Sequence, residues 1–129
     1  MKKLALIIFC WLACHFCFGQ NRRRFVIDSI KHELSVSKHD TSRILNLVML
    51  GHAYRYFKQD SALFYAQQAQ TLANQIGFHG GEARAFSLFA ILMHASGNLP
   101  KSLEYGFKAV QVADTYNLQA EKTDRKSVV

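Results

Sequence analysis

The feature that most constrains this chain is an internal repeat with a period of about 40 residues. Residues 61–69 (Ser-Ala-Leu-Phe-Tyr-Ala-Gln-Gln-Ala) align with residues 101–109 (Lys-Ser-Leu-Glu-Tyr-Gly-Phe-Lys-Ala). Small residues coincide in the two copies: Ala62 and Ser102, Ala66 and Gly106, Ala69 and Ala109. Their spacing places them on one face of a helix, where small side chains allow a neighbouring helix to approach closely. The repeat therefore predicts an array of packed helices.

Each of these segments is preceded by a stretch with the apolar spacing of an amphipathic helix. The spacing is carried by Ile44, Leu47, Val48, Leu50, Gly51 and Tyr54 in the first copy and by Phe86, Phe89, Ala90 and Met93 in the second. The turn signals are Asp60 as a helix cap, Gly97 as a helix end, Pro100 as a helix start, and Gly77, Gly80 and Gly81 as a break between the copies. We expect helices over about 41–57, 61–76, 82–96 and 100–116, preceded by a capping helix within about 23–36.

The N-terminus has the pattern of an export signal, which we assign to residues 1–19. Lys2 and Lys3 supply the positive start, residues 4–13 form an apolar run, and Cys17-Phe18-Gly19 places small residues where a signal peptidase reads the chain. Cleavage after Gly19 would leave a periplasmic or cell-envelope protein that begins with a lead-in segment, residues 20–40.

Two alternatives to a cleaved signal are a membrane anchor and a lipoprotein. The apolar run extends over about 15 residues, which is short of the roughly 20 that span a bilayer. The arginines at 22–24 would also have to cross the membrane, which the charge bias of insertion opposes. Leu12-Ala13-Cys14 matches a lipobox in part, but Trp11 stands where an aliphatic residue is usual.

Removal of this segment changes what the composition implies. All three cysteines (Cys10, Cys14 and Cys17) lie within it, so the mature chain would have no disulfide and no thiol chemistry. Without Lys2 and Lys3, 14 basic side chains remain against 9 acidic ones, a net charge of about +5. The basic excess lies at 22–24 and 122–126, at the two ends. A nucleic-acid surface concentrates basic residues on one element, so no nucleic acid is expected as a partner.

The helix pairs resemble the tetratricopeptide repeat (TPR) family. The first-helix pattern of that family, a large residue followed by x-x-Leu-Gly-x-x-Tyr, is present as Leu47-x-x-Leu50-Gly51-x-x-Tyr54. Phe86-x-x-Phe89-Ala90-x-x-Met93 is a looser second copy. The small residues of the second-helix pattern fall at Ala62 and Ala69 and at Ser102 and Ala109. The sequence departs from the pattern where Ala66 and Gly106 replace an aromatic residue, and its repeat exceeds the common 34 residues.

The resemblance implies an all-α fold, a right-handed superhelical array of antiparallel helix pairs over about 41–80 and 81–118. A generic array of helical hairpins is the alternative. Residues 119–129 stand where a third repeat should begin, but they carry no apolar periodicity. We expect them to be either the start of a truncated repeat, in a fragment of a longer protein, or an irregular tail.

The flanking segments resemble exported repeat proteins of Bacteroidetes-type bacteria. This resemblance rests on Ile27-Asp28-Ser29-Ile30, on Asp40-Thr41-Ser42-Arg43 and on residues 60–66. It implies an exported protein-interaction scaffold that forms the sensory input segment of a histidine kinase or a transcription regulator. A membrane helix and a kinase or DNA-binding domain would then lie downstream in the intact protein. The alternatives are a freestanding periplasmic adaptor without an effector domain and a helical enzyme.

Nothing in the sequence predicts catalysis by this chain. It has no metalloprotease, phosphate-loop or nucleophile-elbow motif, and His79-Gly80-Gly81 is interpreted as a turn between helices. Of the six histidines, His52 and His94 lie on helices of the same type, but without a carboxylate or thiol at ligand spacing. We therefore expect no enzyme activity, cofactor or metal in this chain, and proteins or peptides as its partners.

The TPR resemblance also predicts a binding groove, because the first helix of each pair lines the concave face in that family. It places His52 and Arg55 in the groove together with Arg84, Ser87 and His94, which would suit an acidic peptide or a carboxylate terminus. Ordinary solvated positions are the alternative. The residues predicted to pack between helices are Leu47, Leu50, Gly51, Tyr54, Ala62, Ala66, Ala69, Phe86, Phe89, Ala90, Met93, Ser102, Gly106 and Ala109. Tyr56, Tyr65 and Tyr105 are also expected to pack between helices.

Overall fold

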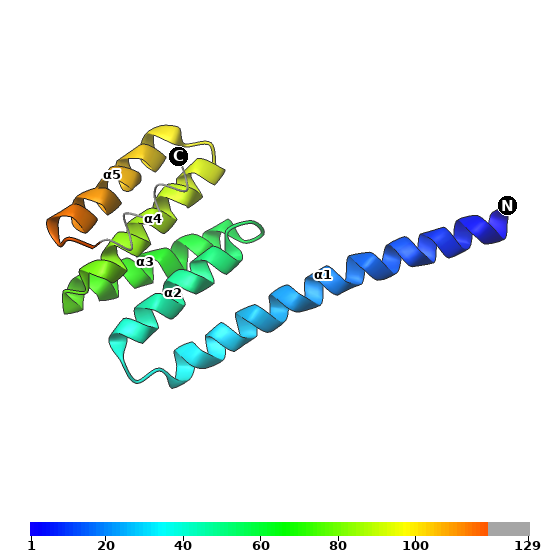
Figure 1. Ribbon diagram of the computed structural model, residues 1–129, viewed down its shortest axis with the longest axis horizontal. Helices are drawn as coiled ribbons and strands as arrows, with labels where there is room; N and C mark the ends of the chain where they lie inside the picture. The colour runs from blue at the N-terminus through cyan, green and yellow to red at the C-terminus, as the bar shows by residue number, and fades with distance from the viewer. Residues whose placement is uncertain (119–129) are drawn as a thin grey trace.

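A computed structural model describes residues 1–118 of the chain, and for residues 6 and 9–21 it describes the backbone alone. The described part contains the helices α1 (Lys2–Val36), α2 (Asp40–Tyr54), α3 (Gln59–Ile76), α4 (His79–Ala95) and α5 (Leu99–Thr115) (Figure 1). No strand occurs among these residues, so the expected all-α fold is confirmed. Residues 119–129, the expected truncated repeat or tail, lie outside the described part.

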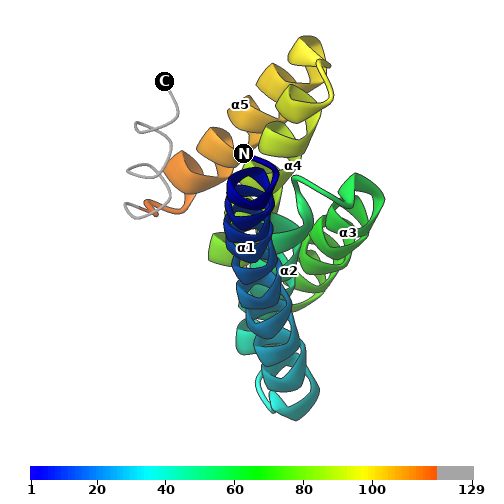
Figure 2. The same ribbon diagram turned by 90° about the vertical axis from the view of Figure 1, so that its right-hand side faces the viewer.

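The last four helices form a stack of two antiparallel pairs, α2 with α3 and α4 with α5 (Figures 1 and 2). Each helix packs against the next one along the chain, and α2 also packs against α4. The first helices of the two pairs are therefore direct neighbours, while α5 is the last helix of the described stack.

The first helix is longer than the expected capping helix, because α1 continues without a break from Lys2 to Val36. It projects from the stack as a rod, and its C-terminal part lies on α2 (Figure 1). Ile27 and Ile30 are buried there against Leu50 of α2. With residues 6 and 9–21 left aside, no helix of the described part is both long enough and apolar enough to cross a bilayer.

A charged side chain borders this α1–α2 contact. The ammonium nitrogen of Lys31 lies 5.8 Å from the centroid of the Tyr54 ring. The side-chain hydrogen bond with Tyr54 raises the pKa of Lys31 above its usual 10.5, because it favours the charged form of the lysine. This exposed contact thus lies at the edge of the α1–α2 packing.

The main core combines large side chains on α2 and α4 with alanines on α3. Ile44, Leu88 and Leu92 have no exposed surface. The face of α3 that meets them consists of alanines that are at most 1% exposed: Ala62, Ala66, Ala69 and Ala73. Because alanine ends at Cβ, both α2 and α4 can approach the α3 backbone closely. The small residues of the repeat thus set the distance between neighbouring helices.

Three helices end in the same turn, which returns the chain antiparallel to the helix it leaves. The residue with positive φ is Gly77 after α3 (69°), Gly97 after α4 (78°) and Asn117 after α5 (55°). In each turn the following amide donates to a carbonyl five residues earlier: Phe78 to Ala73 at 2.8 Å, Asn98 to Met93 at 2.9 Å, and Leu118 to Ala113 at 2.7 Å. Glycine and asparagine adopt this conformation at the lowest steric cost.

The structure corrects two of the expected turn signals, Asp60 and the Gly80-Gly81 pair, and adds a cap in front of Pro100, which lies in the first turn of α5 as expected. Asp60 does not cap α3, because the helix begins one residue earlier at Gln59, and Lys58 occupies the cap without a side-chain bond. The cap of α5 is Asn98, whose side chain accepts from the Lys101 amide at 3.2 Å. Gly80 and Gly81 do not separate the helix pairs, because both are buried in the first turn of α4.

Candidate interaction groove

The five residues predicted to line a groove lie on α2 and α4, the two helices that pack side by side. His52 is on the last turn of α2, and Arg55 directly follows that helix. Arg84, Ser87 and His94 share one face of α4 because they are three and seven residues apart. Arg84 and His94 are exposed, and the other three are half-buried. The structure brings His52 and Arg55 together at the end of α2, and it places the other three residues on the neighbouring helix α4.

Arg55 contacts two side chains close to it in the sequence, His52 on the last turn of α2 and Tyr56 just beyond that helix. A guanidinium nitrogen of Arg55 lies 3.0 Å from Nδ1 of His52. Because guanidinium can only donate hydrogen bonds, Nδ1 of His52 must be the acceptor, and its proton is on Nε2. The central carbon of the guanidinium lies 4.4 Å from the centroid of the Tyr56 ring, within the range of a cation–π interaction.

One donor of Arg55 has no partner. Its Nε is buried and forms no hydrogen bond with any residue that the structure describes. A buried donor without an acceptor costs free energy. We define the Arg55 cluster as His52, Arg55 and Tyr56. The positive charge and the N–H donors of the guanidinium favour an anionic hydrogen-bond acceptor as the ligand of this cluster.

The position of Tyr56 corrects the expectation that it packs between helices. Its side chain is 77% exposed and lies against the guanidinium of Arg55. The sequence did not reveal this role because Tyr56 follows the C-terminal end of α2, where helical spacing no longer determines the direction of a side chain. The other two tyrosines do pack between helices: Tyr65 stacks on Tyr54 at 5.6 Å and Tyr105 on Phe89 at 5.0 Å.

The residues predicted to pack between helices have two degrees of burial. The buried ones are Leu47, Leu50, Gly51, Ala62, Ala66, Ala69 and Ala109, and the half-buried ones are Tyr54, Phe86, Phe89, Ala90, Met93, Ser102 and Gly106. On α4 the fully buried large residues are Leu88 and Leu92, which the family pattern did not mark. The marked residues Phe86 and Phe89 instead stack on Tyr105 of α5. Helix α4 is therefore buried on two sides, and the TPR pattern identified only the side that faces α5.

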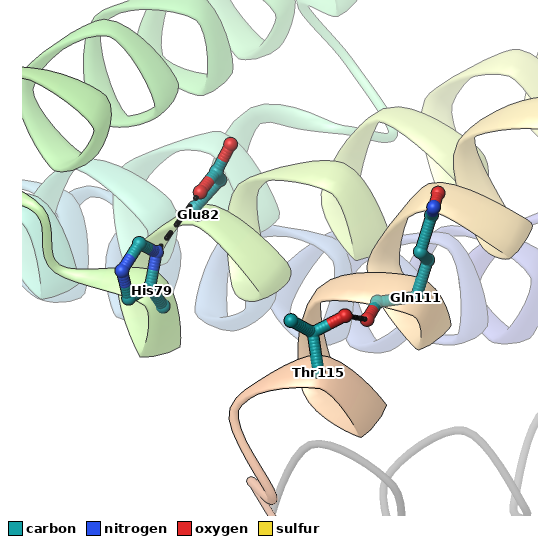
Figure 3. A network of polar contacts seen from close by, with 4 residues as sticks. All are labelled: His79, Glu82, Gln111 and Thr115. Carbon is teal, nitrogen blue, oxygen red and sulfur yellow. Dashed lines mark hydrogen bonds and ion pairs between the residues drawn. The ribbon is translucent and has the colours of Figure 1, made fainter.

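The segment His79-Gly80-Gly81 begins α4 and is not a turn between helices. A Cβ atom added to Gly81 would lie 2.6 Å from Phe78 and 2.7 Å from Ile44, so this glycine allows close packing. Nδ1 of His79 lies 3.5 Å from a carboxylate oxygen of Glu82 (Figure 3), and the His79 ring stacks on Tyr116 at 3.4 Å. On the facing helix α5, the Thr115 hydroxyl donates to the Gln111 carbonyl at 2.7 Å (Figure 3). The stack of His79 on Tyr116 joins the start of α4 to the end of α5.

A hollow of about 430 Å³ lies between α2 and α3. Arg43 and Leu47 line it from α2, and Phe64, Gln68 and Leu72 line it from α3. It shares no residue with the Arg55 cluster. Within residues 1–118, with the side chains of 6 and 9–21 left aside, no group of three or more histidine, cysteine or carboxylate side chains is arranged to hold a metal ion.

Antiparallel helix pairs joined by repeated short turns define the class of helical-repeat domains. Within that class, the chain belongs to the tetratricopeptide repeat family: the model described as the SusR N-terminal TPR domain matches residues 19–114, most of the chain. No curated protein and no solved structure matches the chain. TPR domains serve as protein-interaction scaffolds and are generally not catalytic.

Proposed function

We propose that the chain is an exported scaffold that binds an acidic segment of a protein partner through the groove between α2 and α4. The observation that carries this proposal is the Arg55 cluster, in which a partly buried guanidinium is oriented by His52 and Tyr56 and retains an unpartnered Nε. A guanidinium fixed in this way can bind a carboxylate through two parallel hydrogen bonds. A side chain that is already immobile also loses little conformational entropy on binding.

The remaining groove residues extend this basic character onto α4. Arg84 and His94 are exposed and lie on the face that also carries Ser87. A peptide that lies along the groove would place one carboxylate at Arg55 and further acidic side chains along α4. Exposed charges of this kind raise the association rate and the specificity more than the affinity, so the affinity should depend mainly on Arg55.

We expect that the substitution Arg55→Gln lowers the affinity for an acidic peptide by about tenfold or more, because a hydrogen bond to a charged group contributes about 1.5–3 kcal/mol. The probe is a fluorescein-labelled Glu-Ala peptide with a free C-terminal carboxylate, and the measurement is fluorescence anisotropy at 50 and 200 mM salt. Arg84→Glu should also weaken binding, with little change in helicity by circular dichroism.

The matched control is Arg43→Gln. Arg43 is an exposed arginine of α2, and it lines the hollow between α2 and α3 instead of the groove. This variant should bind as the unmodified chain does. An amidated peptide in which alanine replaces every glutamate should not bind. Equal losses in Arg43→Gln and Arg55→Gln would show that net charge alone is responsible and would refute the groove.

The export part of the proposal depends on the N-terminal sequence and on the extent of the family match. The match begins at residue 19, the last residue of the proposed signal. We expect that the chain, produced with its own N-terminus in a Gram-negative host, is recovered from the periplasm with Gln20 as its first residue. Intact-mass spectrometry measures this directly. A Gly19→Leu control should slow processing, because signal peptidase requires a small residue there. Recovery of the cytoplasmic, full-length chain would contradict export.

We further propose that this scaffold is the sensory input segment of a signalling protein, a histidine kinase or a transcription regulator. The proposal is supported by the resemblance of the flanking segments and by the match to the SusR N-terminal TPR domain. The alternative is a freestanding adaptor. Reading the native gene beyond the codon for Val129 distinguishes them: the sensor requires a membrane helix and an effector domain in the same reading frame, whereas the adaptor requires a stop codon without them.

A further inference from the structure

The hollow between α2 and α3 combines an apolar floor with one cation. Leu47, which is 6% exposed, and the half-buried Leu72 line it from the two helices, together with the ring of Phe64. The Phe64 ring is 56% exposed, but it packs edge-on against Tyr65 with ring centroids 5.6 Å apart. Among the lining residues, all of which belong to the described part, Arg43 is the one charged side chain. The hollow thus pairs hydrocarbon with a single positive charge.

The guanidinium of Arg43 is available to a ligand. Its side chain is exposed, and within the part of the chain that the structure describes it takes part in no hydrogen bond or ion pair. The other polar side chains that line the hollow are uncharged: Gln67, Gln68, Thr71 and Gln75. An anion in the hollow therefore meets an unpaired guanidinium and no lining carboxylate. Because guanidinium can donate two parallel hydrogen bonds to a carboxylate, a carboxylate is the anion that suits Arg43 best.

The packing of α2 on α3 gives the hollow a direction and a length. The two helices lie side by side and antiparallel (Figure 1). A Cβ atom added to Gly51 would lie 3.3 Å from the Ala62 carbonyl oxygen, so these two residues are level with each other. Arg43 comes eight residues before Gly51. Thr71 comes nine residues after Ala62, so it is level with Arg43. Phe64 comes seven residues before Thr71. At about 1.5 Å per residue, Phe64 lies about 10 Å along the helix from the charged end.

The second repeat lacks this combination of side chains. At the positions equivalent to Arg43 and Phe64 it has Glu82 and Glu104. A phenylalanine, Phe86, replaces the smaller leucine that lines the hollow from α2. The equivalent face of α4 and α5 therefore carries a larger ring and two carboxylates, which repel an anion. The hollow of the first repeat is thus not a general consequence of the repeat pattern.

We propose that the hollow between α2 and α3 binds a small amphipathic carboxylate, a monoanion with an unbranched hydrocarbon chain. Its carboxylate pairs with Arg43, and its chain lies over Leu47 and Leu72 toward the ring of Phe64. Burial of the chain against this floor supplies the hydrophobic part of the affinity. The volume of about 430 Å³ is within the range of about 300–1,000 Å³ that is typical of small-molecule sites.

This site is separate from the groove of the proposed function. It shares no residue with the Arg55 cluster, and it takes a free small molecule instead of a protein segment. The Glu-Ala peptide has no hydrocarbon chain to fill the hollow, so Arg43→Gln remains the control for peptide binding. Conversely, Arg55→Gln should leave the binding of the small carboxylate unchanged. The two proposals can therefore fail independently.

Isothermal titration calorimetry of the full-length chain with sodium octanoate, below its micelle concentration, tests the site. The unmodified chain should bind octanoate at one saturable site. Arg43→Glu, which copies the residue of the second repeat, should lower the affinity at least tenfold, because repulsion replaces attraction. The matched control is Lys101→Glu, the same reversal of charge at an exposed position of α5, which should leave the affinity unchanged. Absence of binding at millimolar octanoate, or an equal loss in the two variants, would overturn the proposal.

Two further ligands separate the charge from the hydrocarbon. Octan-1-ol has the same chain without the carboxylate, and it should bind at least tenfold more weakly than octanoate. Hexanoate has the same charge and should bind more weakly by about fourfold or more, because two fewer methylenes are buried. An alcohol that binds as tightly as octanoate would show that Arg43 does not anchor the ligand. Equal affinities of hexanoate and octanoate would show that the chain does not lie on the apolar floor.

Filling the hollow with a larger side chain tests its position. Thr71→Trp places a large ring level with Arg43 and should lower the affinity for octanoate at least tenfold. The matched control is Gln111→Trp, since Gln111 is the equivalent and also exposed residue of α5, and it should bind octanoate as the unmodified chain does. Both variants should keep the helicity of the unmodified chain by circular dichroism. Full binding by Thr71→Trp, or an equal loss in both variants, would refute the assignment of the ligand to this hollow.

Discussion

Replacing Leu88 by alanine is expected to lower the free energy of unfolding by about 2–5 kcal/mol, the range observed when a buried leucine is truncated. Leu88 has no exposed surface. It lies against Gly51 of α2 so closely that a Cβ atom added to Gly51 would be 2.4 Å from its Cδ2. The surrounding helices can hardly close over the lost volume, because alanines and a glycine already bring them together. Urea titration followed by circular dichroism at 222 nm measures the change.

The matched control is Leu103→Ala, which removes the same atoms from a leucine that is 63% exposed. Its cost should stay within about 0.5 kcal/mol, as for most surface substitutions. If Leu88→Ala cost no more than Leu103→Ala, the assignment of Leu88 to the main core would be wrong.

The second large effect is expected from Ala66→Leu. Ala66 is fully buried in the alanine face of α3, in the main core with α2 and α4. A leucine there must push a neighbouring helix outward, and overpacking of a dense core costs about 1–3 kcal/mol and occasionally more. The same urea titration should show a lower midpoint, together with weaker near-ultraviolet ellipticity from the stacked Tyr54 and Tyr65 rings.

The repeat again provides the control, because Gly106 occupies the equivalent position in α5 with open space around it. Gly106→Ala should raise the free energy of unfolding by about 0.5–1 kcal/mol, since alanine restricts the unfolded chain and favours the helix. The two equivalent positions should therefore respond with opposite signs. A loss of stability in Gly106→Ala would mean that this face of α5 is covered.

Helical periodicity and the repeat were sufficient to predict the all-α class, because it depends on the spacing of small and large residues, and the resemblance to the TPR patterns identified the family. The helix ends were less predictable. Asp60 has the chemistry of a cap, but the chain enters α3 two residues earlier at Lys58, whose identity gives no signal. Gly80 and Gly81 were misinterpreted as a break because a glycine that permits close packing and one that permits a turn look alike in a sequence.

The groove residues could be placed on α2 and α4 from the repeat pattern, but their contacts could not. The orientation of Arg55 depends on Tyr56, which lies beyond the end of α2 and outside the periodic pattern. Similarly, the burial of Leu88 and Leu92 depends on α4 having neighbours on two sides, which a pattern drawn for one face does not reveal. The sequence thus identified helix faces, and the arrangement of the stack determined which side chains meet.

The order of packing along the stack has a consequence for the rate and cooperativity of folding. In the described part each helix packs against its neighbour in the chain, and α2 and α4 are the most widely separated pair in contact. Such a low contact order is typical of domains that fold in microseconds to milliseconds, because little loop entropy is lost before contacts form. Helical-repeat domains of this kind can nucleate at any pair and spread to the next. Damage to α5 should therefore spare the α2–α3 pair, and the domain can lose its outer helix before it unfolds as a whole.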